Sequence, residues 1–266
     1  MTVPLKQFST PIHCCSIETI PHGDNMYFAC GMYELLEDSK RRSGKVALCD
    51  ENGIFFEMDV TAGVLDMKFN GSTVACALSS GDIGVYQHSG RELHPVQHIV
   101  ADEDCDEGLA LSVGWSPNYS VDVNTPASHF VVSSENGSIQ IYTLEASGYR
   151  LSRNIPQAHM LMGECVPTWI AAYNVHDDNV IVSGGDDMAI RLWDIRSATP
   201  VYQSNRHFSA GVTSAEWHPL SDHAHVLAVG SYDGSIKLWD DRQMRQPLTD
   251  MQTGASTTSP PCAAHF

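Results

Sequence analysis

The sequence predicts an all-β protein built from repeated four-stranded antiparallel sheets, and three observations lead to this prediction. Residues 183–196 and 229–242 share one pattern, in which small residues precede a turn Asp and alternating apolar residues then end in Trp-Asp. Turn chemistry favours such an Asp, and period-two alternation is typical of a half-buried strand. Trp193 and Trp239 lie 46 residues apart, close to the repeat of about 40 to 45 residues of a propeller blade that ends in Trp-Asp.

A histidine precedes each copy at a similar distance, His159 by 28 residues before Asp187 and His207 by 26 before Asp233. The pattern indicates a WD-repeat β-propeller. In WD-repeat blades, which the segments resemble, a His, the turn Asp, a strand Ser or Thr and the Trp form a buried hydrogen-bonded chain. We therefore favour a structural role over a catalytic triad for His159, Asp187, Trp193, His207, Ser231, Asp233 and Trp239. Replacing His207 by Ala is then expected to cost roughly 1–3 kcal/mol.

The composition excludes several function classes. The chain has 266 residues and a net charge of −17, which argues against binding to phosphate backbones or anionic membranes and favours a basic or cationic partner. It has neither a long apolar run nor the pattern of a signal peptide, so we expect a soluble, cytoplasmic protein. The eight cysteines lack paired metal-ligand spacing. We therefore expect no metal, no cofactor and no disulfide framework.

Further strand patterns predict five blades. Residues 11–60 form a degenerate first blade, in which the charged residues 34–44 are expected to be a surface loop. The second and third blades turn at residues 80–82 and 135–137, and the acidic residues 102–107 are expected to form a solvated loop. The third strands of the five blades are expected to end at Cys49, Tyr86, Tyr142, Trp193 and Trp239.

Recognised enzyme motifs do not occur in the chain. It has no nucleophile elbow, no zinc-protease helix motif, no phosphate-binding glycine loop and no dinucleotide fingerprint. Residue types and spacings alone therefore favour a protein-interaction propeller.

A family resemblance changes this interpretation. Ala158-His159, Glu164, Trp169-Ile-Ala-Ala-Tyr173, the Gly-Gly-Asp-Asp stretch at 184–187 and the following Trp-Asp-Ile-Arg resemble the diphthine methyl esterase family of WD-repeat proteins. The similarity is good over residues 155–254 and patchier before them. The resemblance implies a hydrolase of the diphthamide pathway that removes a methyl ester from an over-methylated diphthine intermediate on elongation factor 2.

A candidate site follows from the expected blade geometry. The residue before the turn Asp tends to face the top rim of a propeller, and Trp169 belongs to the inner strand of the same blade as Asp186. Carboxylates beside aromatic rings can hold the trimethylammonium cation of the substrate, although packing and turn-capping roles explain the same residues equally well. We expect Asp186 to act as general base on water, and substrate contacts from Trp169, Tyr232, Glu135 and the backbone of Gly184 and Gly185, the glycines as oxyanion donors.

A non-catalytic adaptor is the alternative. The two boxes that end in Arg196 and Arg242 resemble the paired Trp-Asp-x-Arg boxes of substrate receptors for cullin-RING ubiquitin ligases, in which the arginines face a propeller adaptor. Both roles can coexist in one protein.

The propeller is expected to be incomplete. Five blades over residues 11–252 compare with the seven of the family that the chain resembles, and residues 253–266 have the small, polar, Pro-containing composition of a disordered tail. An open arc of blades exposes apolar faces. Aggregation and loss of esterase activity are therefore expected for a chain of this length.

Overall fold

The computed structural model describes residues 8–20, 27–36, 41–101, 108–117, 127–197 and 199–253. The chain divides into an N-terminal unit, Met1–Ala110 with Ser120–Pro126, and a C-terminal unit, Leu111–Tyr119 with Ala127–Phe266. The expected acidic loop at 102–107 lies outside the described residues, and so does the expected tail at 253–266 apart from Thr253.

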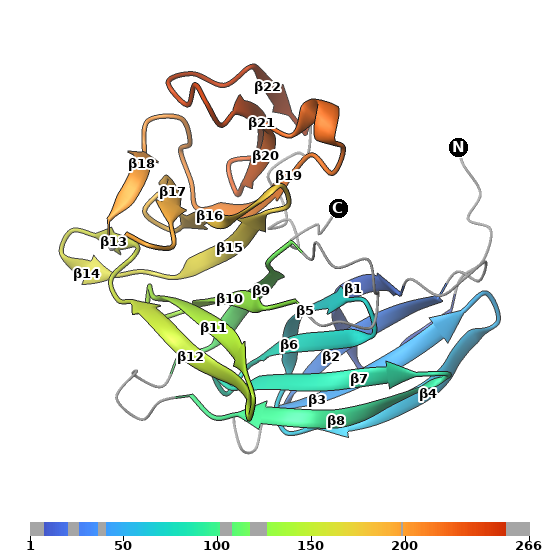
Figure 1. The fold of residues 1–266 in the computed structure, drawn as a ribbon. Coiled ribbons are helices and arrows are strands. Elements are labelled where there is room, and N and C mark those ends of the chain that lie inside the picture. Colours follow the sequence, from blue (N-terminus) through green and yellow to red (C-terminus); the bar gives the residue numbers. More distant parts are fainter. Residues whose placement is uncertain are drawn as a thin grey trace, which may run out of the picture. The chain divides into compact units, whose positions relative to one another are not determined.

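The N-terminal unit contains two four-stranded antiparallel sheets, with their strands in chain order (Figure 1). Antiparallel strands in sequence order need only short hairpin connections, which matches the turn signals of the sequence. The first sheet is β1 (His13–Ile20), β2 (Tyr27–Leu36), β3 (Arg41–Asp50) and β4 (Gly53–Val60), and the second is β5 (Val64–Asn70), β6 (Thr73–Leu78), β7 (Ile83–Ser89) and β8 (Glu92–Ile99).

The prediction of a surface loop at residues 34–44 is wrong. The ladder between β2 and β3 continues through Glu34, which pairs with Ser43, to Leu36, which pairs with Arg41. Charged residues are compatible with this hairpin because its end carries exposed side chains on β2. High charge marked solvent exposure here, and it did not mark the end of the strands.

The C-terminal unit contains three further four-stranded antiparallel sheets and a short hairpin (Figure 1). A 3-10 helix, Ser221–His223, precedes β20. The three sheets are β9 (Ala110–Trp115), β10 (His129–Ser134), β11 (Ile139–Glu145) and β12 (Gly148–Ile155); β15 (Thr168–Asn174), β16 (Asp177–Gly185), β17 (Ile190–Asp194) and β18 (Pro200–Ser204); β19 (Val212–Trp217), β20 (Val226–Ser231), β21 (Ser235–Asp240) and β22 (Thr249–Gln252); the hairpin is β13 (Met160–Leu161) with β14 (Glu164–Cys165).

Five four-stranded sheets confirm the all-β, WD-repeat β-propeller class with five blades. The residues expected to close the third strands lie on β3, β7, β11, β17 and β21, and all five are buried. Four of them, Cys49, Tyr86, Trp193 and Trp239, belong to apolar cores. None of the helices in the described part of the chain is long and apolar enough to cross a membrane.

Apolar cores join the neighbouring sheets of the C-terminal unit. One core combines residues of β10 and β11 with residues of β15 to β17, and another combines β15 to β17 with β19 to β21. A polar contact reinforces the first, because the buried Ser112 hydroxyl accepts the backbone N–H of Ala171 at 3.0 Å. The strand β15 is thereby held from both sides, and it carries Trp169.

Matching hydrogen bonds align the turns between the second and third strands. The backbone N–H of the residue after the turn Asp donates to the carbonyl oxygen of the residue two positions before that Asp. Met188 donates in this way to Gly185, and Gly234 donates to Ser231. The same bond joins Gly137 to Ser134. By this alignment Glu135, Asp186 and Tyr232 occupy one equivalent position in three successive sheets, as the sequence predicts.

Candidate functional site

Asp186 and Trp169 form a directed polar contact on one sheet of the C-terminal unit. The indole N–H of Trp169, on β15, donates to Oδ1 of Asp186 at 2.6 Å. The backbone of Asp186 is fixed as well, because its N–H donates to Pro167 O at 3.1 Å. The carboxylate is therefore oriented by its neighbours while both side chains remain half-buried.

Tyr232 joins this pair from the next sheet. Its ring meets that of Trp169 edge to face, with centroids 5.7 Å apart and planes at 88°. Its backbone N–H donates to Gly211 O, as that of Asp186 does to Pro167. The result is a corner of one carboxylate and two perpendicular aromatic rings, which we call the Asp186 corner.

Gly211 belongs to the Asp186 corner, and the sequence interpretation missed it. A Cβ at this position would lie 2.5 Å from Oδ1 of Asp186 and 3.5 Å from the Tyr232 ring. Only glycine leaves the carboxylate where it is. The one available signal was its place directly before β19, opposite the turn that carries Tyr232.

Glu135 occupies the equivalent turn position on the preceding sheet, and its side chain is exposed. The hydrogen bond and the ring contact that join the other residues come from Trp169, Asp186 and Tyr232, and neither involves an atom of Glu135. These two contacts bring together Trp169, Asp186 and Tyr232.

Gly184 and Gly185, the expected oxyanion donors, lie at the end of a strand. Both are buried within β16, where a Cβ on Gly184 would lie 2.3 Å from Val212 Cγ1 and one on Gly185 would lie 2.6 Å from Nδ1 of His159. Close packing therefore explains these glycines. Their burial argues against a role as oxyanion donors at the rim.

His159 lies at the centre of a buried polar chain beside this corner. Its Nδ1 is 2.7 Å from Oδ1 of Asp187, and its Nε2 is 2.8 Å from Oγ of Ser183. Trp193 donates its indole N–H to the same Ser183 oxygen at 2.9 Å. One orientation satisfies all donors, with Trp193 donating to Ser183, Ser183 to His159, and His159 to Asp187.

This orientation requires a neutral His159 with its proton on Nδ1. Arg191 also approaches Nδ1 at 2.7 Å, but a protonated nitrogen cannot accept from it, so we assign the guanidinium to Oδ2 of Asp187, also 2.7 Å away. The pKa of His159 is lowered, because the effect of burial outweighs the opposite effect of the Asp187 carboxylate. Burial alone would raise the pKa of Asp187, but His159 and Arg191 together lower it.

The second copy does not form the expected chain. Among the described residues no hydrogen bond joins His207 to Asp233, and the buried indole N–H of Trp239 has no partner. His207 instead packs edge to face on Trp239 at 4.8 Å. Ser231 donates to Ala210 O, and Asp233 accepts from Ser209 and Ser235.

Strand register gives the physical reason for this difference. Ser183 pairs with Arg191 in the first copy, and Val229 pairs with Lys237 in the second. A valine, which has no acceptor, thus replaces the Ser that receives the Trp N–H. Ser231 is equivalent to Gly185, where a Cβ would collide with the His ring, so a histidine cannot occupy the same place.

Comparison with known proteins agrees with this architecture. The family model described as WD domain, G-beta repeat matches residues 166–194 and 198–240. A protein of Mus musculus named diphthine methyltransferase is 31% identical over 279 residues, which cover 93% of this chain and 56% of the relative. The protein of that name from Homo sapiens is 29% identical over 282 residues, covering 92% of this chain and 60% of the relative.

The chain is similar to these diphthine methyltransferases along most of its own length. A homolog from Dictyostelium discoideum is 26% identical over 275 residues, covering 88% of this chain and 70% of its own length. These relatives confirm the resemblance that the sequence motifs indicated. The chain spans little more than half the length of the mouse and human diphthine methyltransferases.

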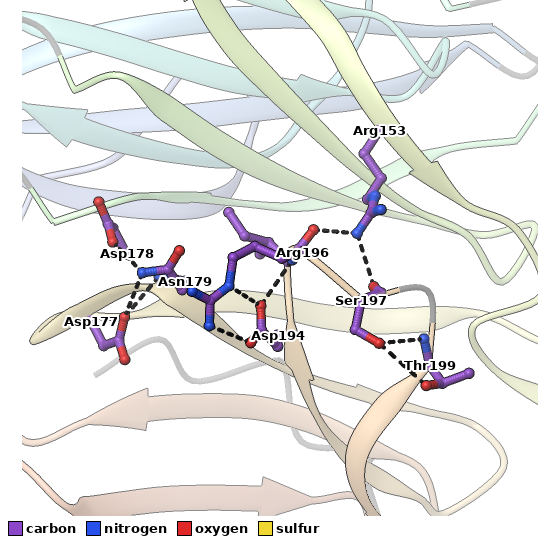
Figure 2. A network of polar contacts seen from close by, with 9 residues as sticks. Arg153, Asp177, Asp178, Asn179, Asp194, Arg196, Ser197 and Thr199 are labelled. Atoms are coloured by element: carbon purple, nitrogen blue, oxygen red, sulfur yellow. Dashed lines mark hydrogen bonds and ion pairs between the residues drawn. The ribbon is translucent and has the colours of Figure 1, made fainter.

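Two Asp–Arg forks complete the polar features of the C-terminal unit. Arg196 binds Asp194 through Nε at 2.8 Å and Nη2 at 2.6 Å, and its backbone N–H donates to the same carboxylate (Figure 2). Arg242 repeats this geometry on Asp240, at 2.8 and 2.7 Å. The hydrogen-bonded arginines hold the pKa of Asp194 and of Asp240 at about 2.

A neighbouring strand supports the first fork. Arg153, on β12, donates to the carbonyl oxygens of Ile195 and Ser197, so the segment after Asp194 is tied to the adjacent sheet (Figure 2). Both fork arginines remain largely exposed, at 71% and 64% of the side chain. Each fork therefore presents a fixed guanidinium on the surface.

Proposed function

We propose that this protein acts in diphthamide biosynthesis as a methyl ester hydrolase on the over-methylated diphthine of elongation factor 2. Similarity to the diphthine methyltransferases supports the pathway. The Asp186 corner is the observation that supports a site for this activity, since it places a carboxylate against two aromatic rings. The modified histidine of the expected substrate bears a trimethylammonium group, which this combination of groups recognises.

The corner offers the substrate cation two kinds of attraction. The carboxylate of Asp186 supplies a negative charge, and the Trp169 and Tyr232 rings supply aromatic faces, each contributing about 0.5–2 kcal/mol to the binding of a cation. The perpendicular arrangement presents the two rings in different planes. A bulky quaternary ammonium can thus contact both a ring face and the carboxylate.

In the hydrolytic step, Asp186 acts as the general base. Oδ1 is held by Trp169, and among the described residues Oδ2 has no hydrogen-bond partner. Oδ2 would take a proton from water as the water oxygen bonds to the ester carbonyl carbon. The protonated Asp186 then returns this proton to the methoxy oxygen as the bond from the carbon to that oxygen breaks, so that methanol leaves and the acid product ionises to the free carboxylate.

Methanol release tests this function. Wild-type protein and Asp186→Asn are incubated with elongation factor 2 that carries methylated diphthine, without any methyl donor, so that methyl transfer from a donor cannot contribute. The amide is isosteric but cannot act as base, so we expect a loss of at least about 100-fold in rate. A change within twofold, with wild type active, contradicts the role of Asp186.

The wild-type measurement separates the site from the function. Methanol formation that is unaffected by Asp186→Asn overturns the assigned base and leaves the hydrolase in place. Absence of methanol from a monodisperse, cooperatively melting wild-type sample overturns hydrolysis by this chain. Melting temperatures of both proteins show whether the substitution altered the fold.

A second candidate function rests on the two Asp–Arg forks. Their matched geometry and exposure on neighbouring sheets suit recognition by a partner propeller, as in the substrate receptors of cullin-RING ligases. A rigid guanidinium loses little side-chain entropy on binding. This role uses residues outside the Asp186 corner and is compatible with the hydrolase.

A further inference from the structure

A pocket of the C-terminal unit concentrates positive charge in a strongly acidic protein. It has a volume of about 910 Å³, and Arg191, Arg206 and Arg245 line it. These are three of the 15 Lys and Arg residues in a chain of net charge −17. Among the described lining residues Asp187 is the one carboxylate, and its two oxygens already contact His159 and Arg191.

Two of the arginines are available to a ligand. Arg206 and Arg245 are exposed, and neither forms an ion pair within the described part of the chain. His207 lies beside them in the lining, and its pKa is lowered, first by burial and then by the charges of Lys237 and Arg206. The pocket is thus electropositive, because no carboxylate among the described residues pairs with Arg206 or Arg245.

Core contacts hold both arginine segments in place. Met244, next to Arg245, is buried in the apolar core, and its carbonyl oxygen accepts the Tyr202 hydroxyl at 2.5 Å. Phe208 anchors the segment that carries Arg206 in the same core. The two guanidinium groups therefore extend from fixed backbone positions.

The pocket also has an apolar lip and a free strand edge. Leu161 and Met162 line it from the β13–β14 hairpin, and Met162 is 98% exposed with a positive φ of 53°. The residues Tyr202 to Ser204 of β18 line another side, and β18 is the edge strand of its sheet. An edge strand offers backbone groups that an added strand can pair with.

We propose that this pocket binds an acidic peptide segment of a partner protein. Carboxylates of the peptide segment pair with Arg206 and Arg245, and the backbone of the segment follows β18. One apolar side chain of the segment packs on Leu161 and Met162. A small inorganic anion would use the arginines alone, whereas the volume, the apolar lip and the strand edge suit an extended chain. The proposal is independent of the hydrolase and uses no residue of the Asp186 corner.

Fluorescence anisotropy with a defined probe tests this docking. The probe is a fluorescein-labelled peptide in which Glu and Leu alternate, and the matched control peptide has Gln at every Glu. We expect binding of the Glu peptide alone, weakened by added salt because the pairs are partly exposed. The variant Arg206→Gln with Arg245→Gln should bind about tenfold more weakly, as expected for two exposed ion pairs.

Two further variants separate charge from apolar contact. Met162→Asn should weaken peptide binding severalfold while the melting temperature stays unchanged, because Asn tolerates a positive φ and Met162 has no packing to lose. Arg150→Gln, an exposed arginine on β12 outside the pocket, should change the affinity by less than about twofold.

Several outcomes would overturn the proposal. They are a folded wild-type protein that does not bind the Glu peptide, equal binding of the Gln peptide, unchanged affinity of the double arginine variant, and tighter binding of inorganic phosphate than of the peptide. The last result would identify a small-anion site.

Discussion

The indole N–H of Trp169, on β15, lies 2.6 Å from Oδ1 of Asp186, which lies in the turn after β16 of the same sheet. This bond leaves one oxygen of the carboxylate to act on a ligand. It also places the Trp169 ring where it meets Tyr232 of the next sheet.

Replacing Trp169 by Phe should separate orientation of Asp186 from aromatic packing. The variant keeps a ring but loses a hydrogen bond to a charged group, worth about 1.5–3 kcal/mol. We expect kcat/KM for methanol release to fall about 10- to 100-fold, with a melting temperature close to wild type. An unchanged rate would show that Asp186 acts without this bond.

Tyr232 should affect substrate binding through its ring. Tyr232→Ala removes the aromatic face, and we expect KM for the methylated elongation factor to rise about 2- to 30-fold. Tyr232→Phe serves as the control, because it keeps the ring and should shift KM much less. Equal effects of the two variants would assign the role to the hydroxyl.

Gly211→Ala should displace the carboxylate of Asp186. The added methyl group would lie 2.5 Å from Oδ1, so the carboxylate or the turn must move, and a shift of about 1 Å at a reacting group costs up to about 100-fold in rate. Steady-state kinetics together with a crystal structure of the variant would check this. Normal activity would place the reacting group elsewhere.

The two histidines should differ in their contribution to stability. His159→Ala removes two buried hydrogen bonds, one to Asp187 and one to Ser183, and we expect the free energy of unfolding to fall by roughly 2–4 kcal/mol. His207→Ala loses ring packing on Trp239 and should cost about 0.5–1.5 kcal/mol. Chemical denaturation of both variants measures the difference, and a larger loss for His207 would contradict the structure.

Stability should decrease as the pH falls below neutrality. Burial keeps His159 neutral in the folded state. Below the ordinary histidine pKa of about 6.5 the unfolded chain therefore binds more protons than the folded chain, which favours unfolding. The lowered pKa of Asp187 acts in the same direction below about pH 4. Denaturation curves across this range test the sign, and a gain in stability on acidification would contradict it.

Loss of both fork arginines should abolish adaptor binding if the protein is a ligase receptor. Arg196→Ala combined with Arg242→Ala removes both exposed guanidinium groups, and we expect a co-purifying cullin adaptor to be lost while methanol release is retained. Arg150→Ala is the matched control. Retention of the adaptor by the double variant would contradict this role.

The sequence by itself determined the repeated sheets, because alternation, turn residues and Trp-Asp endings are local signals. The residues expected to end the third strands all lie on the third strand of their sheet. The equivalent rim positions of Glu135, Asp186 and Tyr232 followed from the same local repeat. The similarity to the diphthine methyltransferases was visible in the motifs around the first Trp-Asp copy.

Tertiary structure decided which residues meet. Register placed Val229 where the first copy has Ser183, so two similar sequences formed different polar chains around His159 and His207. Packing between strands explained Gly185 and revealed Gly211, since a glycine's role depends on what its absent side chain would touch. The Trp169–Asp186 bond likewise depends on the spacing of two strands, a distance that the order of residues does not contain.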